Sequence, residues 1–230
     1  MLKRYTSKIE YTAYTACAFL VVTGLVLASV NLKYFEDSYT TEDGPIESLT
    51  PVCLLICALL CSKRLSYWWK RKDGRKVLSM LILMVLCLFG AGEEISWGQR
   101  IYDIPCPEYF KTHNAQAELN IHNLVVEGVK INKLVFSNLL GAVWILFLFL
   151  LPALYVRTSR VRTFCDRWAI PVPRLAQIIV YSVLAGLTYS IRSDSKFELG
   201  EFLACTFLLL ISWRPFNSHI LPESRSTPRE

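Results

Sequence analysis

Two adjacent glutamates, Glu93 and Glu94, stand near the end of a long apolar block and are the first candidates for chemistry. Ionisable side chains at membrane depth are costly, so they are usually either functional or paired with another group. A partly buried carboxylate is also a stronger base than one in water. Either glutamate is therefore a candidate general base, and the alternative is a structural ion pair with Arg100 or Arg192.

A second group of polar residues follows in the loop after this block. Polar side chains alternate strictly with Ala, Ala, Leu and Ile, a period of two that predicts an extended segment. Such a segment places five side chains along one edge: Asn114, Gln116, Glu118, Asn120 and His122. This density of amide, carboxylate and imidazole groups is unusual for a connection, and long structured loops often carry function.

Together these residues predict an acid and base site. Glu93 or Glu94 would be the general base, and His122 would act as the acid or stabilise developing charge. The polar and aromatic residues around this site would bind the substrate, by hydrogen bonds or by lining the pocket: Glu47, Trp97, Gln99, Arg100, Asn114, Gln116, Glu118, Asn120 and Asn123. No cofactor motif occurs in the sequence, so a hydrolase or transferase fits best and no cofactor is predicted. A zinc ion on Glu94 and His122 would lack a recognised ligand spacing, and no metal site is predicted.

Two other functions stay open at this point. In a non-enzymatic binding or assembly protein, the carboxylates would be structural and the amide row would satisfy the backbone of a re-entrant loop. A small transporter would need polar residues through the whole membrane depth, whereas these residues gather at one end. The sequence does not decide whether the protein is an enzyme.

The segments that must position these residues are long apolar blocks. The chain has 230 residues, of which 53% are hydrophobic, and a helix needs roughly 20 mostly apolar residues to cross a bilayer. We expect an all-α, polytopic membrane helix bundle formed by residues 1–214, with about six transmembrane helices. The expected spans are 11–30, 46–61, 77–97, 134–156, 175–191 and 199–213, of which the second and sixth are short enough to be re-entrant. The third is followed by a structured outer loop, 98–133, and the chain closes with a loose tail, 215–230.

The formal net charge of +6 arises mainly from Lys and Arg in alternate connections. Connections rich in Lys and Arg stay in the cytoplasm, so both termini are predicted to be cytoplasmic and the number of spans even. This pattern favours the lipid bilayer as the main partner, together with a lipid-linked substrate or a membrane partner protein, and it argues against nucleic acid. Most of the eight cysteines fall within apolar blocks, where cysteine packs as a small hydrophobe.

The two polar motifs also carry a resemblance. The string from Glu93 to Arg100, E-E-I-S-W-G-Q-R, followed by N-x-Q-x-E-x-N-x-H-N from Asn114, resembles an uncharacterised family of small, mostly bacterial, multi-pass membrane proteins. The segment 42–47 is similar to that family as well. The resemblance implies a site at this place and a cell inner membrane location, but no particular reaction.

A partial likeness to the CAAX-type intramembrane proteases rests on the same residues. Those enzymes carry E-E-x-x-x-R, F-x-x-x-H and H-x-x-x-N motifs. Here Arg100 lies further from the glutamates, and Asn123 follows His122 directly. The likeness implies a glutamate that activates water and a histidine and asparagine that hold an oxyanion.

Overall fold

The computed structural model describes residues 7–41, 44–114, 117–121, 124–126, 129–130 and 138–222. The regular elements of this part of the chain are helices, apart from one antiparallel pair of two-residue strands, so the predicted all-α class is confirmed. The long helices are α1 (Lys8–Val30), α3 (Leu49–Lys70), α4 (Gly74–Glu94), α9 (Leu175–Tyr189) and α10 (Lys196–Trp213). The remaining elements are α2 (Leu32–Tyr34), η1 (Phe35–Tyr39), η2 (Ser96–Gly98), α5 (Glu108–His113), β1 (Val125–Val126), β2 (Val129–Lys130), α6 (Leu140–Ile145), η4 (Leu146–Leu150), α7 (Leu151–Arg157), α8 (Ser159–Arg167) and η5 (Ser218–Ile220).

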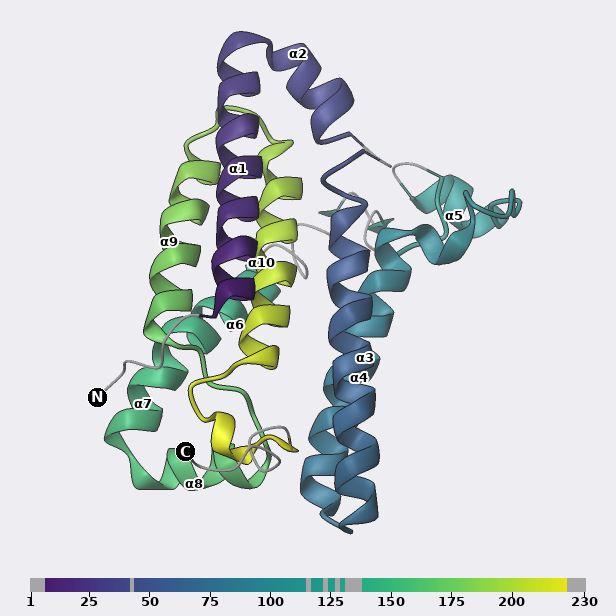
Figure 1. Ribbon diagram of the computed structural model, residues 1–230. Helices are drawn as coiled ribbons and strands as arrows, with labels where there is room; N and C mark the ends of the chain where they lie inside the picture. The colour runs from purple at the N-terminus through teal and green to yellow at the C-terminus, as the bar shows by residue number, and fades with distance from the viewer. Residues whose placement is uncertain are drawn as a thin grey trace.

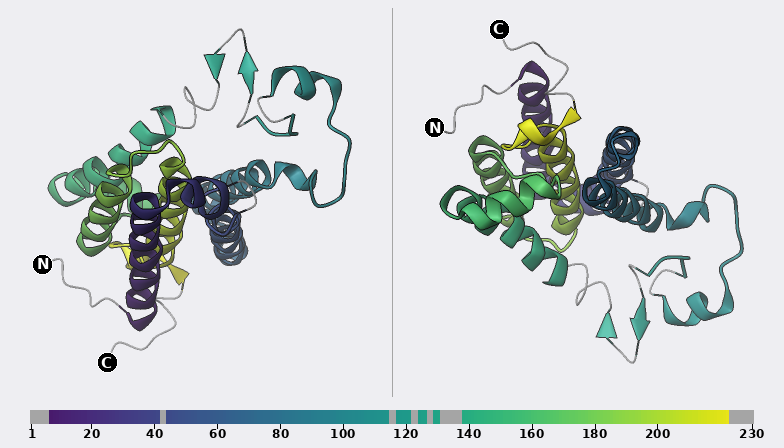
Figure 2. Two further views of the ribbon diagram at one scale, coloured as in Figure 1. Left: turned by 90° about the horizontal axis from the view of Figure 1, so that it is seen from above. Right: turned by 90° about the horizontal axis from the view of Figure 1, so that it is seen from below.

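Helix α10 joins two groups of helices. Helices α1, α9 and α10 run side by side, and α3 and α4 form a hairpin next to them (Figures 1 and 2). The core of the first group is built around Val21, Leu199 and Phe207, which are fully buried. A second cluster packs the hairpin against α10 through small side chains such as Cys57 and Cys87. The cysteines of the apolar blocks therefore serve in packing between helices.

Among the residues that the structure describes, four helical segments are long and apolar enough to cross a membrane: Lys8–Val30, Leu49–Lys70, Gly74–Glu94 and Leu140–Arg157. Their apolar side chains are largely exposed, and large residues such as Phe19, Leu59 and Leu86 are each more than half exposed. A soluble monomer rarely shows so much contiguous apolar surface. The arrangement is the one expected of helices whose outer faces contact lipid.

The observed helices overlap all six predicted segments, with informative differences. Helix α3 is an unbroken helix of 22 residues, longer than the short segment expected at 46–61. Helix α4 ends at Glu94, before the predicted limit at Trp97. In the fourth segment, the helix widens to a π turn over Leu146–Leu150 just before Pro152. Proline has no N–H and its ring crowds the preceding turn, so a local change of helix geometry is expected there.

A cluster of ion pairs joins the start of α1 to the segments next to α9 and α10. Glu10, fully buried in α1, pairs with Arg174 and, at 3.0 Å, with Arg214. Nearby, the buried Arg64 of α3 donates hydrogen bonds to the carbonyl oxygens of Ser212 and Trp213 at the end of α10. Several basic residues that the charge pattern assigned only to membrane orientation thus also join helices to each other.

Candidate functional site

The candidate site begins where α4 stops. Ser96, Trp97 and Gly98 follow the helix with positive φ angles of 47°, 53° and 79°. Left-handed backbone costs roughly 1–2 kcal/mol for each residue other than glycine, so this turn must be held by other contacts. The turn folds the Trp97 ring back onto Gly92, where a Cβ atom would lie 2.9 Å from the ring. Gly92 therefore leaves the space that the tryptophan needs, and Phe89 packs against the same ring edge to face.

Glu93 is held rigidly by this turn and by the loop beyond it. One carboxylate oxygen accepts a 2.8 Å hydrogen bond from the Trp97 indole, and the other accepts a 2.7 Å bond from the Ile121 backbone N–H. Only 2% of Glu93 is exposed. A carboxylate with both oxygens engaged and almost no exposure is suited to joining α4 to its loop.

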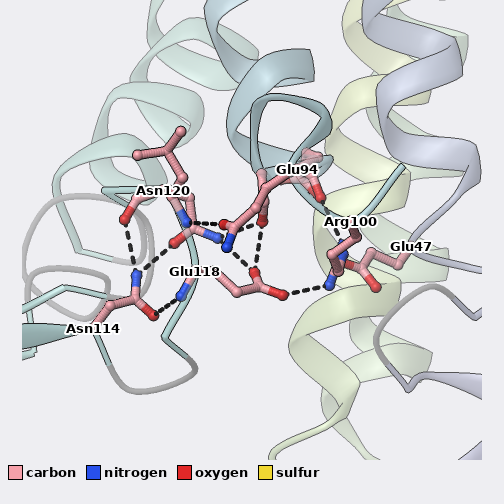
Figure 3. A network of polar contacts seen from close by, with 9 residues as sticks. Glu47, Glu94, Arg100, Asn114, Glu118 and Asn120 are labelled. Carbon is pink, nitrogen blue, oxygen red and sulfur yellow. Dashed lines mark hydrogen bonds and ion pairs between the residues drawn. The ribbon is translucent and has the colours of Figure 1, made fainter. Parts of the chain in front are cut away.

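Glu118 is the centre of the polar network in the loop (Figure 3). One of its oxygens accepts hydrogen bonds from Ser96 Oγ at 2.6 Å and Asn120 Nδ2 at 2.8 Å, and the other pairs with Arg100 at 2.7 Å. Asn120 also donates a 3.0 Å bond to Ser96 Oγ. Short hydrogen bonds to a charged group are strong, so Glu118 holds the turn after α4 against the later part of the loop, 22 positions along the chain from Ser96.

Asn114 and Asn120 complete the network from the loop side. Asn114 donates to the carbonyl and side-chain oxygens of Asn120 at 2.9 and 3.0 Å, and it accepts a 3.2 Å bond from the Glu118 N–H. The prediction that Asn114, Glu118 and Asn120 face a common side is therefore correct. The prediction of a straight extended edge is wrong, because the chain turns at Ala117, which has a φ of 56°. The turn, rather than a strand, brings the three side chains together.

Gln99 and Arg100 tie the loop to the helices. The Gln99 side-chain oxygen accepts a 2.5 Å bond from the Leu119 N–H. Arg100 binds Glu118 on one side and reaches Glu47, near the start of α3, at 3.7 Å on the other (Figure 3). Arg100 thus forms its shortest described ion pair with Glu118, and the structural pairing of Arg100 with Glu93 or Glu94 stays a prediction.

Glu94 points to different surroundings. It lies close enough to Glu47 and Glu198 to be repelled by them, and Glu201 of α10 is repelled by Glu94 in turn. Within the described ranges, the Glu94 carboxylate accepts no hydrogen bond and joins no ion pair, although its backbone carbonyl receives a 3.5 Å contact from Arg100. The two adjacent glutamates therefore lie in different surroundings.

Three of the predicted site residues, Gln116, His122 and Asn123, lie outside the described residues, and the pairing of a glutamate with His122 stays a prediction. His113 is exposed, stacks on Tyr109 and takes no part in the network. In the part of the chain that the structure describes, no group of three or more His, Cys, Asp and Glu side chains is arranged to hold a metal ion.

Sequence reasoning missed two contributors to the site. Ser96 was not predicted as a site residue, yet its hydroxyl joins Glu118 and Asn120. Gly92 was not singled out either, although a glycine five residues before a tryptophan at a helix end is a usable signal for a ring folded back on the helix.

Comparison of the chain with protein-family models, with curated proteins and with solved structures gives no match. The chemistry of the site is therefore argued from its own geometry.

Proposed function

We propose that this chain is an integral membrane protein with six transmembrane helices and both termini in the cytoplasm, located in a bacterial inner membrane. At the outer end of α4 it binds a membrane-embedded or lipid-linked substrate, and Glu94 acts there as the general base of a hydrolase or transferase reaction. The network around Glu118 positions the loop over this end of the helix and takes no direct part in the chemistry.

The observation that carries the proposal is the contrast between neighbouring carboxylates. Glu93 and Glu118 have both oxygens occupied by donors of the chain itself. Glu94 is partly exposed and accepts no hydrogen bond from the described residues. A general base must be within reach of the proton that it removes, so a carboxylate whose lone pairs are already used is a poor candidate and Glu94 is the better one.

Further support comes from the acidic residues next to it. Glu198 and Glu201 of α10 and Glu47 near α3 place three further carboxyl groups around Glu94 at the end of an apolar helix. Such a place attracts a substrate group that donates hydrogen bonds, such as a hydroxyl or an ammonium group. Those are also the groups from which a base removes a proton in hydrolase and transferase chemistry.

The proposal is tested with Glu94→Gln in the full-length protein. The lipid extract of membranes that contain the wild type is compared by mass spectrometry with that of membranes that contain Glu94→Gln at equal protein abundance. We expect a lipid-linked species to accumulate in the variant while its product declines. Identical lipid profiles at equal abundance would contradict an enzymatic role for Glu94.

A second function is favoured by the complete engagement of Glu93 and Glu118. A binding or assembly protein needs a rigid outer loop and no reactive group, and this network provides that rigidity. Under this alternative, Glu94→Gln leaves the lipid profile unchanged, and Glu118→Gln releases a membrane partner that co-purifies with the wild type. Chemical cross-linking before and after this substitution separates the alternatives.

A further inference from the structure

The turn between α3 and α4 and the helix α8 lie at the end of the bundle away from α5 (Figure 1). Two adjoining cavities are lined by residues of this turn and of α8. Their volumes are about 520 and about 690 Å³, and both are lined by Arg75 and Trp168. We call the joined space the basic cavity, because most of the charged residues that line it are Arg or Lys. It shares no residue with the site at the outer end of α4.

One face of α8 supplies a wall of this cavity. Arg160, Thr163, Phe164 and Arg167 line it, and their spacing of three and four residues places them on one side of the helix. The opposite side carries Cys165, which is fully buried. Two of the three arginines of α8, Arg160 and Arg167, therefore line the cavity, while Arg162 donates to the carbonyl oxygens of Tyr155 and Val156.

The arginines of the cavity are available to a ligand. Arg75, Arg160 and Arg167 are exposed, and none of them forms an ion pair with a carboxylate in the described ranges. The one carboxylate at the rim, Asp73, is occupied because it caps α4 and pairs with Lys76 at 2.8 Å. That pairing lowers the pKa of Asp73, against the raising effect of its partial burial, so Asp73 stays ionised and bound to Lys76.

The start of α8 adds neutral donors to these cations. Ser159 lies at the first position of the helix and lines the cavity. Thr158 gives no side-chain cap, so the first backbone N–H groups of this nine-residue helix remain for another acceptor. Arginines, hydroxyls and a helix N-terminus together form the donor set that binds phosphate oxygens.

We propose that the basic cavity binds a phosphate group at the cytoplasmic membrane surface, with Arg75, Arg160 and Arg167 as its main ligands. The phosphate can belong to an anionic lipid headgroup or to a soluble phosphate compound. The exposed side chains of Phe164 and Leu78 at the rim fit the lipid source, because they are placed to contact acyl chains. Basic cavities between helices at the cytoplasmic side bind acidic lipids in this way.

The test is equilibrium binding of fluorescent phosphatidylglycerol to the purified full-length protein in neutral detergent, with inorganic phosphate as competitor. The triple variant R75Q/R160Q/R167Q removes the proposed ligands. The matched control K63Q/K70Q/R157Q removes the same charge from exposed residues of the same end that do not line the cavity. Arg160→Glu, a single exposed substitution, gives a second variant with little risk to folding.

We expect the first triple variant and Arg160→Glu to weaken binding at least about tenfold, which corresponds to about 1.4 kcal/mol in binding free energy, because each removes charged hydrogen bonds to the phosphate. The control triple should stay within about twofold of the wild type, as expected for exposed charges that make no specific contact. Competition by inorganic phosphate would identify a soluble phosphate as sufficient, and lack of competition would identify the lipid. Equal loss in both triple variants, or no binding by the wild type, would overturn the proposal.

Discussion

The adjacent residues Glu93 and Glu94 allow a sharp test of the structure, because the same substitution should destabilise the protein at Glu93 and should not destabilise it at Glu94. In Glu93→Gln, the amide oxygen can accept a bond from either the Trp97 indole or the Ile121 N–H, but the amide nitrogen then faces the other donor. One charge-assisted hydrogen bond is lost, and the remaining one becomes neutral and weaker. In Glu94→Gln no hydrogen bond is lost within the described residues, and repulsion with Glu47 and Glu198 is relieved.

The magnitude follows from these contacts. A hydrogen bond to a charged group contributes about 1.5–3 kcal/mol, so Glu93→Gln should cost about 3 kcal/mol in the free energy of unfolding. For a chain of this length, 1 kcal/mol corresponds to about 2–4 °C, which gives a decrease in Tm of about 6–12 °C. Glu94→Gln should change Tm by less than about 2 °C, or raise it, because a negative charge at a helix C-terminus is itself unfavourable.

The assay is thermal unfolding of the purified wild type and both variants in the same detergent, followed by the fluorescence of a thiol-reactive dye that reports exposure of the buried cysteines. Abundance in the membrane gives a second readout. The reasoning would be refuted if Glu93→Gln melted with the wild type, or if both variants lost the same stability. The second result would mean that the Glu94 carboxylate also has a structural partner.

Three further predictions test other parts of the structure. Gly92→Ala should lower the free energy of unfolding by about 1–3 kcal/mol, because the Cβ of the alanine would lie 2.9 Å from the Trp97 ring. An unchanged Tm would contradict the packing of the Trp97 ring on Gly92. Glu10→Gln should cost about 3–5 kcal/mol, because it leaves the buried guanidinium of Arg174 without its carboxylate. The same melting assay measures this, and a loss below about 1 kcal/mol would show that the pair is solvated. A membrane-impermeant maleimide at pH 8 should label Cys106 in spheroplasts. Cys165 should stay unlabelled even after permeabilisation, because burial raises the pKa of its thiol to about 11 and keeps the thiol protonated. Labelling of Cys106 only after permeabilisation would reverse the proposed orientation.

The sequence predicts the helices well because their signal is local. Apolar blocks of membrane-spanning length have few alternatives to a helix, since every backbone group in lipid must be paired within the segment. The period of two between Asn114 and Asn120 likewise identified residues that meet in the structure. The pattern could not reveal the turn at Ala117, because a left-handed alanine is stable only when surrounding contacts hold it.

Contacts between residues that are far apart in the chain cannot be predicted from a single sequence. The pair between Glu10 and Arg214 joins residues 204 positions apart, and only the packing of α1 beside α10 brings them together. The Lys and Arg residues of the connections predict only membrane orientation, which is a property of a segment and carries no information on the partners of Arg174 and Arg214. Their role in joining helices becomes visible only when neighbouring helices are known.

The division of roles between Glu93 and Glu94 depends on where α4 stops. Adjacent residues of a helix point about 100° apart, so one glutamate faces the loop and the other faces α10 only in the register fixed by the helix end. That end is set by the left-handed turn at Ser96, Trp97 and Gly98, which is stable because Glu93 holds Trp97 and Glu118 holds Ser96. The network therefore influences Glu94 without contacting its carboxylate. The contacts that stabilise the strained turn also determine which of the two carboxylates receives no hydrogen bond from the described residues. A substitution at Glu118 should for this reason alter the surroundings of Glu94 as well as the loop.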